Sequence, residues 1–300
     1  MSKLFGGLFK RNLPHQPAEK LPQSTHHEYG AQHQDTNQQP AFYPKQIVVG
    51  SGQSIGIQRD HNEDALYTLT GVLADGQVNE SFGLFILADG MGGHRNGEIA
   101  SGVTCRVIAN FIMAELKTNI LEDAHSYSPE RFSEIISKAI DEAQTAVLKN
   151  APGGGTTVII ALIVGDRVTV SNVGDSRIYF IFPDGRMQKI TRDHSLVQRL
   201  VDLKEITESE AEVHPQKNVL LRAIGQPDPY QADTQTMSFP PGARILLCSD
   251  GLWGVVDEHT IVEVVNSVHD PILACKTLVD AANRNGGPDN ISVIIAWKNG

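Results

Sequence analysis

The sequence predicts an α+β fold built on antiparallel sheets. Segments with strand character come in consecutive runs, and segments with helical character come in blocks between those runs. Short turns also join neighbouring strands: Gly165-Asp166 separates two apolar segments, and Pro183-Asp184-Gly185 separates the next two. A doubly wound parallel sheet would instead alternate single strands with single helices, so that architecture is disfavoured.

Hydrophobic periodicity places the elements along the chain. Apolar runs rich in β-branched residues predict strands at 47–57, 82–88, 156–164, 167–173, 177–182, 187–190, 243–248 and 290–297. Apolar residues that recur at spacings of three and four predict helices at 99–116, 131–148, 260–268 and 272–283. Two shorter helical pieces, 195–201 and 207–212, are expected within a polar segment.

Composition limits the class of protein. The chain has 300 residues, of which 40% are hydrophobic, enough for a sizeable core. Its formal net charge of -10 argues against general nucleic-acid binding, which needs a basic surface. No stretch approaches the ~18 consecutive apolar residues of a membrane span, and no signal peptide is recognisable. Three cysteines without metal or redox spacing fit buried thiols in a reducing compartment, so we expect a cytoplasmic protein.

The N-terminal segment differs from the rest of the chain. Residues 1–45 are rich in Gln, His and Pro and are expected to be disordered, whereas 46–300 are expected to form one catalytic domain. Leu4, Phe5, Leu8 and Phe9 share one helical face, which would suit a docking or membrane-surface peptide. A frayed terminus is the favoured interpretation, because two consecutive glycines interrupt this stretch.

Acidic residues recur at the ends of predicted strands, in four of five cases beside or near glycines. They are Glu63-Asp64, Asp89-Gly90, Gly174-Asp175, Asp250-Gly251, and Asp289 in a Gly-Gly-Pro-Asp run. A single Asp-Gly pair is usually only a turn, but five such sites beside apolar strands suggest that the carboxylates converge. Converging carboxylates repel one another unless cations lie between them, and Mg²⁺ and Mn²⁺ prefer oxygen ligands. The sequence therefore predicts a divalent-cation centre.

The order of these motifs carries a family resemblance. In sequence they are Arg59-Asp-His-Asn-Glu-Asp64, Asp89-Gly-Met-Gly-Gly93, Gly154-Gly-Thr-Thr157, Val173-Gly-Asp-Ser-Arg177, Asp193-His-Ser195, Asn218-Val-Leu-Leu-Arg-Ala-Ile-Gly225, Ser249-Asp-Gly251 and Asp289-Asn290. Over about residues 46–298 the chain resembles the metal-dependent protein phosphatases of type 2C, most closely the bacterial branch. The resemblance implies a four-layer α-β-β-α sandwich, with two antiparallel sheets flanked by helices and a binuclear metal centre at one edge.

The resemblance also implies the roles of the acidic residues. Asp89 would bridge two metal ions, and Asp250 and Asp289 would complete the first ion's ligands. Asp64 and the backbone carbonyl of Gly90 would serve the second ion, largely with waters.

Two further residues complete the implied site. Asp175 resembles the ligand of a third, weaker metal site in bacterial members, shared with Asp250. Arg59 resembles the arginine that clamps the substrate phosphate, for which a guanidinium fork is better suited than a lysine. Arg59, Asp89 and Asp250 are therefore the expected catalytic residues.

The implied activity is hydrolysis of phosphoserine and phosphothreonine in proteins. Water activated between two Mn²⁺ or Mg²⁺ ions attacks phosphorus, and no covalent phosphoenzyme is needed. The expected partners are phosphorylated proteins, in particular a Ser/Thr kinase and its substrates, and the expected state is a monomer.

One residue departs from the animal members of the family. Met91 stands where they carry a histidine proposed as the general acid, and a thioether cannot donate a proton. A metal-bound water near Asp175, His61 and His94 are the alternative acids, with a non-catalytic role favoured for each histidine. The polar segment at about 193–214 resembles the family's mobile flap beside the active site, rather than an ordinary surface insertion.

The sequence disfavours three other functions and leaves a fourth open. A phosphoprotein-binding module of the same fold with a weak or dead centre would lack a metal aspartate, and none is replaced here. A scaffold whose Asp-Gly pairs are only turns would not explain their order. A small-molecule phosphatase stays open, and a serine hydrolase is disfavoured because no Gly-x-Ser-x-Gly motif occurs.

Overall fold

The computed structural model describes residues 45–299 apart from 75–78, 93–94, 123–128 and 228–229. The extension predicted over residues 1–45 lies outside the described residues except for Lys45, as does His94.

Two five-stranded antiparallel sheets form the centre of the catalytic domain, in the strand orders β1-β12-β11-β8-β9 and β10-β7-β6-β3-β2. The first sheet contains β1 (Gln46–Ser54), β12 (Ile291–Asn299), β11 (Arg244–Cys248), β8 (Arg177–Ile181) and β9 (Met187–Lys189). The second contains β10 (Asp233–Ser238), β7 (Arg167–Val173), β6 (Val158–Val164), β3 (Asn79–Ala88) and β2 (Ala65–Ala74). A small third sheet pairs β4 (Gly90–Met91) with β5 (Gly155–Thr156).

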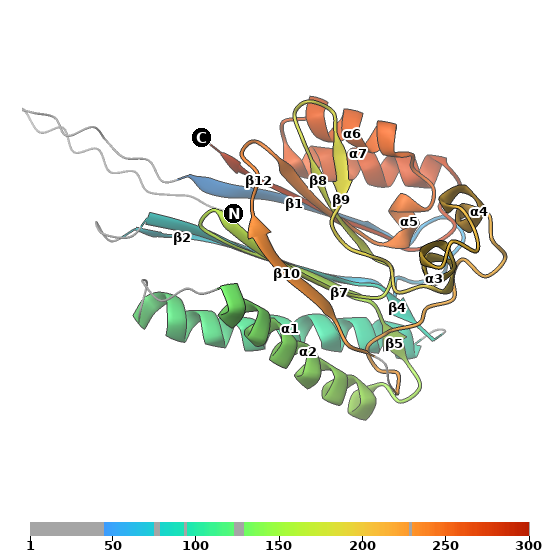
Figure 1. Cartoon of the computed structure of the whole chain (residues 1–300), viewed down its shortest axis with the longest axis horizontal. Coiled ribbons are helices and arrows are strands. Elements are labelled where there is room, and N and C mark those ends of the chain that lie inside the picture. The colour runs from blue at the N-terminus through green and yellow to red at the C-terminus, as the bar shows by residue number, and fades with distance from the viewer. Residues whose placement is uncertain (1–44, 75–78, 93–94, 123–128, 228–229, 300) are drawn as a thin grey trace, which may run out of the picture. The chain divides into compact units, whose positions relative to one another are not determined.

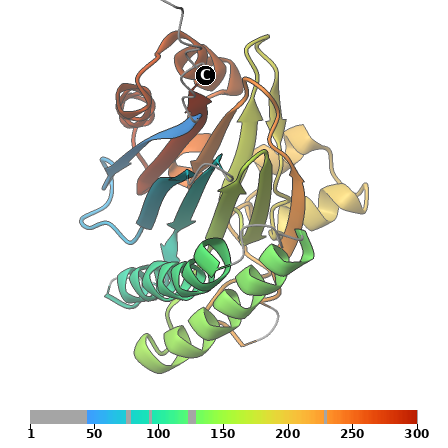
Figure 2. The same ribbon diagram turned by 90° about the vertical axis from the view of Figure 1, so that its left-hand side faces the viewer.

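Helices cover the outer faces of both sheets (Figures 1 and 2). The second sheet is covered by α1 (Arg95–Glu122) and α2 (Pro129–Asn150), and the first by α6 (Glu258–Ser267) and α7 (Pro271–Arg284). The short helices α3 (Leu196–Asp202), α4 (Glu208–Glu212) and α5 (Asp250–Trp253) lie towards one end of the sandwich in Figure 1. The predicted four-layer α-β-β-α sandwich is confirmed.

The core fills all three spaces between the four layers. Strand β3 contributes side chains to two of these spaces, because alternate side chains of a strand point to opposite faces of the sheet. Leu84 and Ile86 pack with the helices α1 and α2, whereas Phe85 and Leu87 pack between the two sheets. All four are fully buried, which explains why this strand is a continuous apolar run.

Helix α1 contains the one described segment, Asn96–Lys117, that is long and apolar enough to span a membrane by length and composition alone. In the structure it is a helix of the sandwich. Ile108, Ile112 and Leu116 are buried in the cluster between the helices and the second sheet. The apolar character of the segment is therefore explained by packing within the domain.

The predicted first strand is wrong at its end, and two edge strands were not predicted. Strand β1 ends at Ser54, and Ile57 is exposed because the chain there turns towards the loop at Gly287. The Glu63-Asp64 pair therefore precedes strand β2 instead of following a strand. Strand β2, an edge strand that is only partly buried, was missed although its sequence, Ala-Leu-Tyr-Thr-Leu-Thr-Gly-Val-Leu-Ala, contains residues typical of strands.

Strand β10 has the polar sequence Asp-Thr-Gln-Thr-Met-Ser, which carries little strand signal. Its pairing with β7 is reinforced by side-chain hydroxyls on adjacent strands. Thr236 and Thr169 lie 2.8 Å apart at their oxygens, as do Thr234 and Ser171. This strand is thus stabilised by its neighbour rather than by its own hydrophobicity.

Candidate metal centre and active site

The aspartates highlighted in the sequence meet at one end of the sandwich. Asp64 precedes β2 and Asp89 follows β3, and these two strands pair next to each other with Ala65 opposite Ala88. Asp250 begins α5 two residues after the end of β11. The last residue of β11, Cys248, pairs with Val293 near the start of β12, and Asp289 lies two residues before that strand. In Figure 1 this end carries α5 and β4. The pairing of the strands therefore brings together carboxylates that are far apart in the sequence.

Asp175 joins the same group from the turn between β7 and β8. It is buried, and the neighbouring charge of Asp250 raises its pKa. That electrostatic effect requires the two carboxylates to lie close to each other. All five aspartates predicted as metal ligands thus belong to one cluster.

Burial and mutual repulsion dominate the electrostatics of this cluster. Burial, followed by the charge of Asp250 and other neighbours, raises the pKa of Asp175 from 3.8 to about 8. Burial, opposed by the nearby Ser292 and Ser249 hydroxyls and reinforced by Asp250, raises the pKa of Asp64 to about 7. For Asp250 burial and the charge of Asp289 raise the pKa to about 6, and the pKa of Asp89 lies well above its usual value for similar reasons.

Asp64 shows that the cluster fits cations. Both of its carboxylate oxygens are buried and have no hydrogen-bond partner among the described residues. The Ser249 and Ser292 hydroxyls affect its pKa, but they do not reach hydrogen-bonding geometry with it. A buried carboxylate without a donor costs free energy, and a divalent cation offers the missing partner.

Among the described residues, no group of three or more His, Cys, Asp or Glu side chains is arranged so that it could hold a metal ion by itself. A set of carboxylates suits Mg²⁺ or Mn²⁺ more than zinc, because these hard cations prefer oxygen ligands, whereas zinc sites are mostly built from Cys and His. The donor chemistry therefore fits the predicted cofactor.

Two threonines fix Asp89, a function that the sequence did not reveal. The Asp89 amide donates to Thr157 Oγ1 at 3.0 Å, and its carbonyl accepts from the Thr157 amide at 2.9 Å and from Thr156 Oγ1 at 2.8 Å. Thr157 in turn bonds the hydroxyl of Ser176, beside Asp175. Only the Gly-Gly-Thr-Thr motif, already part of the family pattern, could have indicated these residues.

Asn290 anchors the loop that carries Arg59. Its side chain donates to the carbonyls of Ile55 at 2.8 Å and His61 at 2.9 Å, and it accepts from the Glu63 amide at 2.8 Å. Asn290 is buried beside Asp289, so one amide group holds the whole 55–63 loop against the cluster. Its place in the Asp289-Asn290 motif was noted from the sequence, but its function was not.

Gly90 is required by close packing rather than by its backbone angles. A Cβ atom at this position would lie 2.5 Å from the carbonyl oxygens of both Glu63 and Gly97. The next residue, Met91, pairs with Gly155 in the small third sheet. The loop after Asp89 is therefore held by β5 on one side and by the start of α1 on the other.

Arg59 lies at the exposed margin of the cluster. Its Nη2 atom is 2.7 Å from Asp289 Oδ2, and its side chain is 52% exposed. The hydrogen bond to Asp289 is the main cause that raises the pKa of this guanidinium. A charged, accessible fork beside the carboxylates is suited to an anionic substrate group.

His61 lies in the same loop and forms a 2.8 Å contact from Nε2 to Glu63 Oε1. Glu63 is buried and His61 is partly exposed. Among the described residues, His61 is the one histidine alternative raised for the general acid, because His94 lies outside them.

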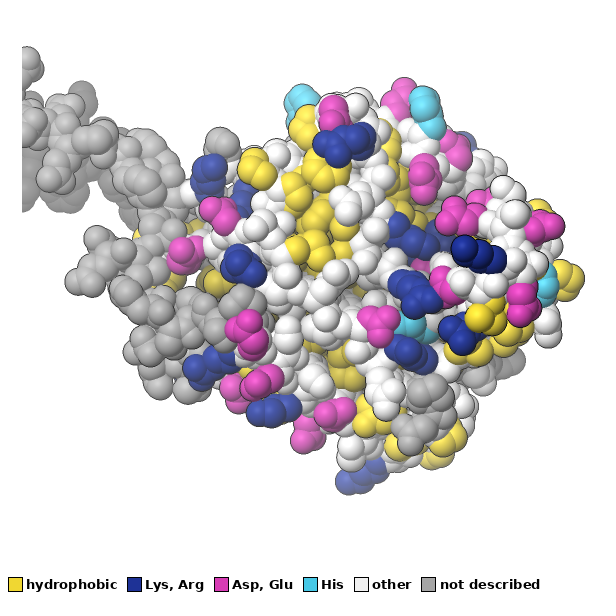
Figure 3. Space-filling model, in the orientation of Figure 1, with side chains coloured by type: hydrophobic (Ala, Val, Ile, Leu, Met, Phe, Trp, Pro, Cys, Tyr) yellow, Lys and Arg dark blue, Asp and Glu magenta, His cyan; other side chains and the backbone are white. Residues whose placement is uncertain are grey.

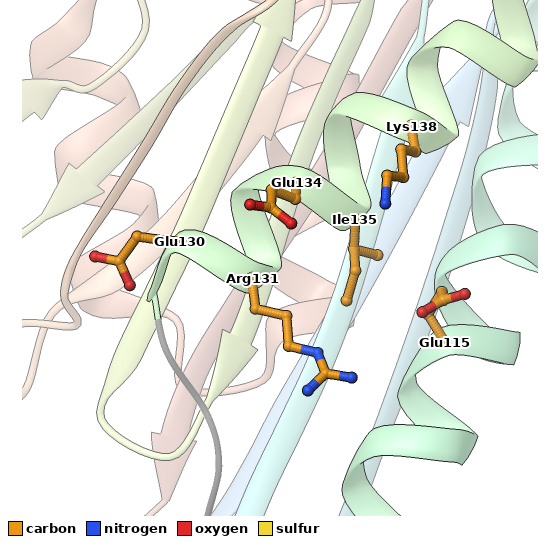
Figure 4. A pocket seen from close by; sticks show the side chains of 6 residues that line it. All are labelled: Glu115, Glu130, Arg131, Glu134, Ile135 and Lys138. Atoms are coloured by element: carbon orange, nitrogen blue, oxygen red, sulfur yellow. The ribbon is translucent and has the colours of Figure 1, made fainter.

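A surface hollow elsewhere does not contribute to this site. It lies between α1 and α2 and is lined by Glu115, Glu130, Arg131, Glu134, Ile135 and Lys138 (Figure 4). None of the clustered aspartates lines it, and its charged side chains include both signs. We assign it no catalytic role.

Comparison with known proteins decides the family. The family model for protein phosphatase 2C matches residues 52–282. The chain belongs to the protein phosphatase 2C family. This match confirms the family resemblance inferred from the order of the motifs. The similarity to the bacterial branch is confirmed as well, because the relatives named below come from bacteria.

Relatives of this type 2C phosphatase match most of its length. The serine/threonine phosphatase stp of Listeria welshimeri is 32% identical over 80% of this chain and 92% of its own. The crystal structure of the Mycobacterium tuberculosis serine/threonine phosphatase PstP/Ppp has 31% identity and a TM-score of 0.67, covering 84% of this chain and 98% of that one. A catalytic domain of PstP in complex with two manganese ions has 29% identity and a TM-score of 0.66, covering 85% and 100%.

Proposed function

We propose that this type 2C phosphatase removes phosphate from phosphoserine and phosphothreonine in proteins, with Mn²⁺ or Mg²⁺ bound at the aspartate cluster. The observation that carries this function is the convergence of five aspartates, one of which, Asp64, has two buried oxygens without partners. The named relatives are serine/threonine phosphatases, and one of their structures contains two manganese ions. The enzyme is therefore a metal-dependent phosphoric monoester hydrolase.

Within the cluster we assign Asp89 as the ligand shared by two cations. Asp250 and Asp289 would complete the first site, and Asp64 with the carbonyl of Gly90 would serve the second. The hydrogen bonds that fix Asp89 on both its amide and its carbonyl support a central role, because a shared ligand must be held rigidly. Asp175, with Asp250, would hold a third and weaker cation.

The bound cations supply positive charge that lowers the pKa of water and stabilises charge on a phosphoryl group. The protein contributes the geometry. Arg59 would bind two phosphoryl oxygens through its guanidinium fork and orient phosphorus over the cluster. Its contact with Asp289 holds it at this margin before substrate arrives.

Titration with Mn²⁺ tests the assignment of the third site. Calorimetry should show that Asp175→Ala retains the two tighter sites, while its turnover of a phosphopeptide is slower than that of the unmodified enzyme. Asp89→Asn is the matched comparison and should lose both tight sites. Loss of the tight sites in Asp175→Ala would contradict the placement of Asp175.

We further propose that the physiological substrates include a phosphorylated Ser/Thr kinase and proteins modified by it, and that the enzyme acts as a cytoplasmic monomer. The test is release of phosphate from an autophosphorylated Ser/Thr kinase of the same cell, compared with a small phosphate ester. Turnover of the ester alone would favour a small-molecule phosphatase. Binding of the phosphorylated kinase without turnover would favour a binding module of the same fold.

A further inference from the structure

The segment predicted as the flap, residues 193–214, is attached to the domain mainly at its base. The helices α3 and α4, which make up most of it, bury none of their residues. At the base, in contrast, Asp193, His194 and Ser195 are all buried. The contacts of these three residues therefore hold the base of the flap.

His194 binds both backbone groups of Gly174. Its amide donates to the Gly174 carbonyl at 2.8 Å, and its Nδ1 atom accepts from the Gly174 amide at 3.2 Å. Gly174 has a positive φ of 103°, and a Cβ atom there would lie 2.6 Å from Thr157 Cγ2. Gly174 has no side chain to fix it, so His194 provides its lateral contacts.

The other ring nitrogen of His194, Nε2, also has a partner. Because Nδ1 accepts a hydrogen bond, the proton of the neutral ring is assigned to Nε2, which donates to Asp233 Oδ2 at 3.1 Å. Arg222 Nη1 also lies 3.3 Å from Nε2, but a guanidinium only donates, so in this tautomer it makes no hydrogen bond to the ring. Burial, which is the largest effect on the ring, lowers the pKa of His194 and favours this neutral form. Arg222 fixes Asp233 in turn, through a 2.8 Å contact from Nη1 to Oδ1.

The residue after Gly174 is Asp175, whose backbone is held by helix α5. Trp253 at the end of α5 donates from Nε1 to the Asp175 carbonyl at 3.1 Å. The guanidinium of Arg177 lies 3.5 Å from the centre of the Trp253 ring and also binds Asp193 through Nη2 and Oδ2 at 2.7 Å. The 174–175 turn is thus in contact with both the base of the flap and α5.

We propose that His194 is a positioning residue that fixes the Gly174–Asp175 turn through its Nδ1 atom, so that the base of the flap sets the position of the Asp175 carboxylate. This inference rests on the proposed role of Asp175 as a cation ligand. It assigns a specific function to a buried histidine outside the metal centre. Residues that orient a ligand in this way typically change metal affinity by roughly 10- to 100-fold when they are replaced.

Two substitutions separate the two ring nitrogens. In His194→Asn the side-chain oxygen can occupy the place of Nδ1 and accept from the Gly174 amide. In His194→Gln the amide group reaches the place of Nε2, towards Asp233, and leaves Gly174 without its acceptor. Both variants have similar polarity, so a difference between them reports on the contact with Gly174 rather than on burial of a polar group.

The readouts are hydrogen exchange of the Gly174 amide by NMR and calorimetric titration with Mn²⁺, neither of which needs turnover. We expect His194→Gln to speed Gly174 exchange about 10-fold or more and to weaken the weakest Mn²⁺ site by roughly 10-fold, with the tighter sites unchanged. His194→Asn should stay close to the unmodified protein in both measurements.

Three results would overturn the proposal. The first is unchanged Gly174 exchange and unchanged Mn²⁺ binding in His194→Gln. The second is equal loss in both variants together with faster exchange throughout the core, which would mean that His194 only stabilises the fold. The third is protection retained in His194→Gln but lost in His194→Asn. Failure of the unmodified protein to bind Mn²⁺ would instead refute the proposed function, while the exchange of Gly174 would still test the role of His194.

Discussion

The environment of a single residue, Asp64, indicates that the site binds cations. An ordinary buried aspartate in a folded protein accepts hydrogen bonds, yet both oxygens of Asp64 lack a partner among the described residues. Its pKa and those of Asp175 and Asp250 are raised, chiefly by burial. The fold therefore holds carboxylates that are unfavourable when charged and that cations would stabilise.

This arrangement predicts how stability depends on pH when a chelator removes divalent cations. The folded pKa values of Asp250, Asp64 and Asp175 are about 6, 7 and 8, above the ordinary value of 3.8, so the folded state binds protons that the unfolded state releases. Stability should therefore fall as pH rises through this range. We expect the melting temperature in chelator to be lower at pH 8.5 than at pH 6.5, measured by calorimetry.

Cation affinity should instead rise with pH, because cations bind the deprotonated form of the same carboxylates. The increase in melting temperature caused by Mn²⁺ should therefore grow between pH 6.5 and 8.5. In Asp64→Asn the fall of the melting temperature between pH 6.5 and 8.5 in chelator should be smaller than in the unmodified protein. A melting temperature in chelator that rises across this interval would contradict the raised pKa values.

A substitution of Arg59 tests whether this single residue binds the substrate phosphate. Lysine keeps the charge but loses the planar fork, so Arg59→Lys should bind a phosphopeptide less tightly. We expect KM to rise about 10-fold, equivalent to ~1.4 kcal/mol, while Mn²⁺ binding is retained. Steady-state kinetics and calorimetry on the same variant provide both values. Unchanged kcat and KM would show that Arg59 does not contact the substrate.

At the scale of elements, close approach between loops shapes the centre as much as the aspartates do. Gly90 lies against backbone atoms of the loop before β2 and of the first turn of α1, and neither neighbour is a flexible side-chain end. Gly90→Ala should therefore displace the loop after Asp89 and lower the free energy of unfolding by ~1–3 kcal/mol. Chemical denaturation measures this loss.

Gly102 in α1 is the matched control for that substitution. The three atoms nearest to a Cβ there belong to the guanidinium of Arg106, the closest at 3.2 Å, and this flexible side-chain end can move aside. Gly102→Ala should be neutral or stabilising by up to about 1 kcal/mol, because alanine favours a helix. Equal stability of the Gly90→Ala and Gly102→Ala variants would show that the contacts around Gly90 are not tight.

The elements also show where prediction from the sequence succeeds and fails. Strands buried on both faces, such as β3 and β6, were predicted because their apolar runs are continuous. The edge strand β10 was missed because its polar residues are stabilised by pairing with β7, which is not encoded locally. Helix α5 was missed because its four residues are too few to show periodicity.

The residues of the candidate site were easier to predict from the sequence than the edge strands. The acidic residues occur in motifs whose order matches a family, so their convergence could be anticipated. The contacts that support them could not. Thr157 bonds Asp89 across 68 residues, and Asn290 bonds the loop at Glu63 across 227 residues, and no local pattern encodes such a pairing.

At the scale of the whole molecule, the described residues form a sandwich whose strands begin at Gln46. On the face shown in Figure 3, basic side chains are interspersed with acidic ones and form no continuous strip. The mixed signs on this face accompany a net charge of -10 for the whole chain.

Deletion of residues 1–45 tests the boundary of the catalytic domain. The deletion stops just before β1, whose pairing with β12 begins at Gln46 opposite Asn299. We therefore expect turnover of a small phosphate ester to change less than about twofold and the melting temperature to stay within about 2 °C. A large loss of either would show that the N-terminal segment belongs to the catalytic fold.

The most direct test of the account is release of phosphate from a phosphothreonine peptide, with and without Mn²⁺, beside the variant Asp250→Asn. We predict that Mn²⁺ is required, that a chelator stops the reaction, and that Asp250→Asn is slower by roughly 100-fold or more, since cations at such sites contribute several kcal/mol. A protein that binds Mn²⁺ but releases no phosphate would contradict the account and would identify the chain as a phosphoprotein-binding module of this fold.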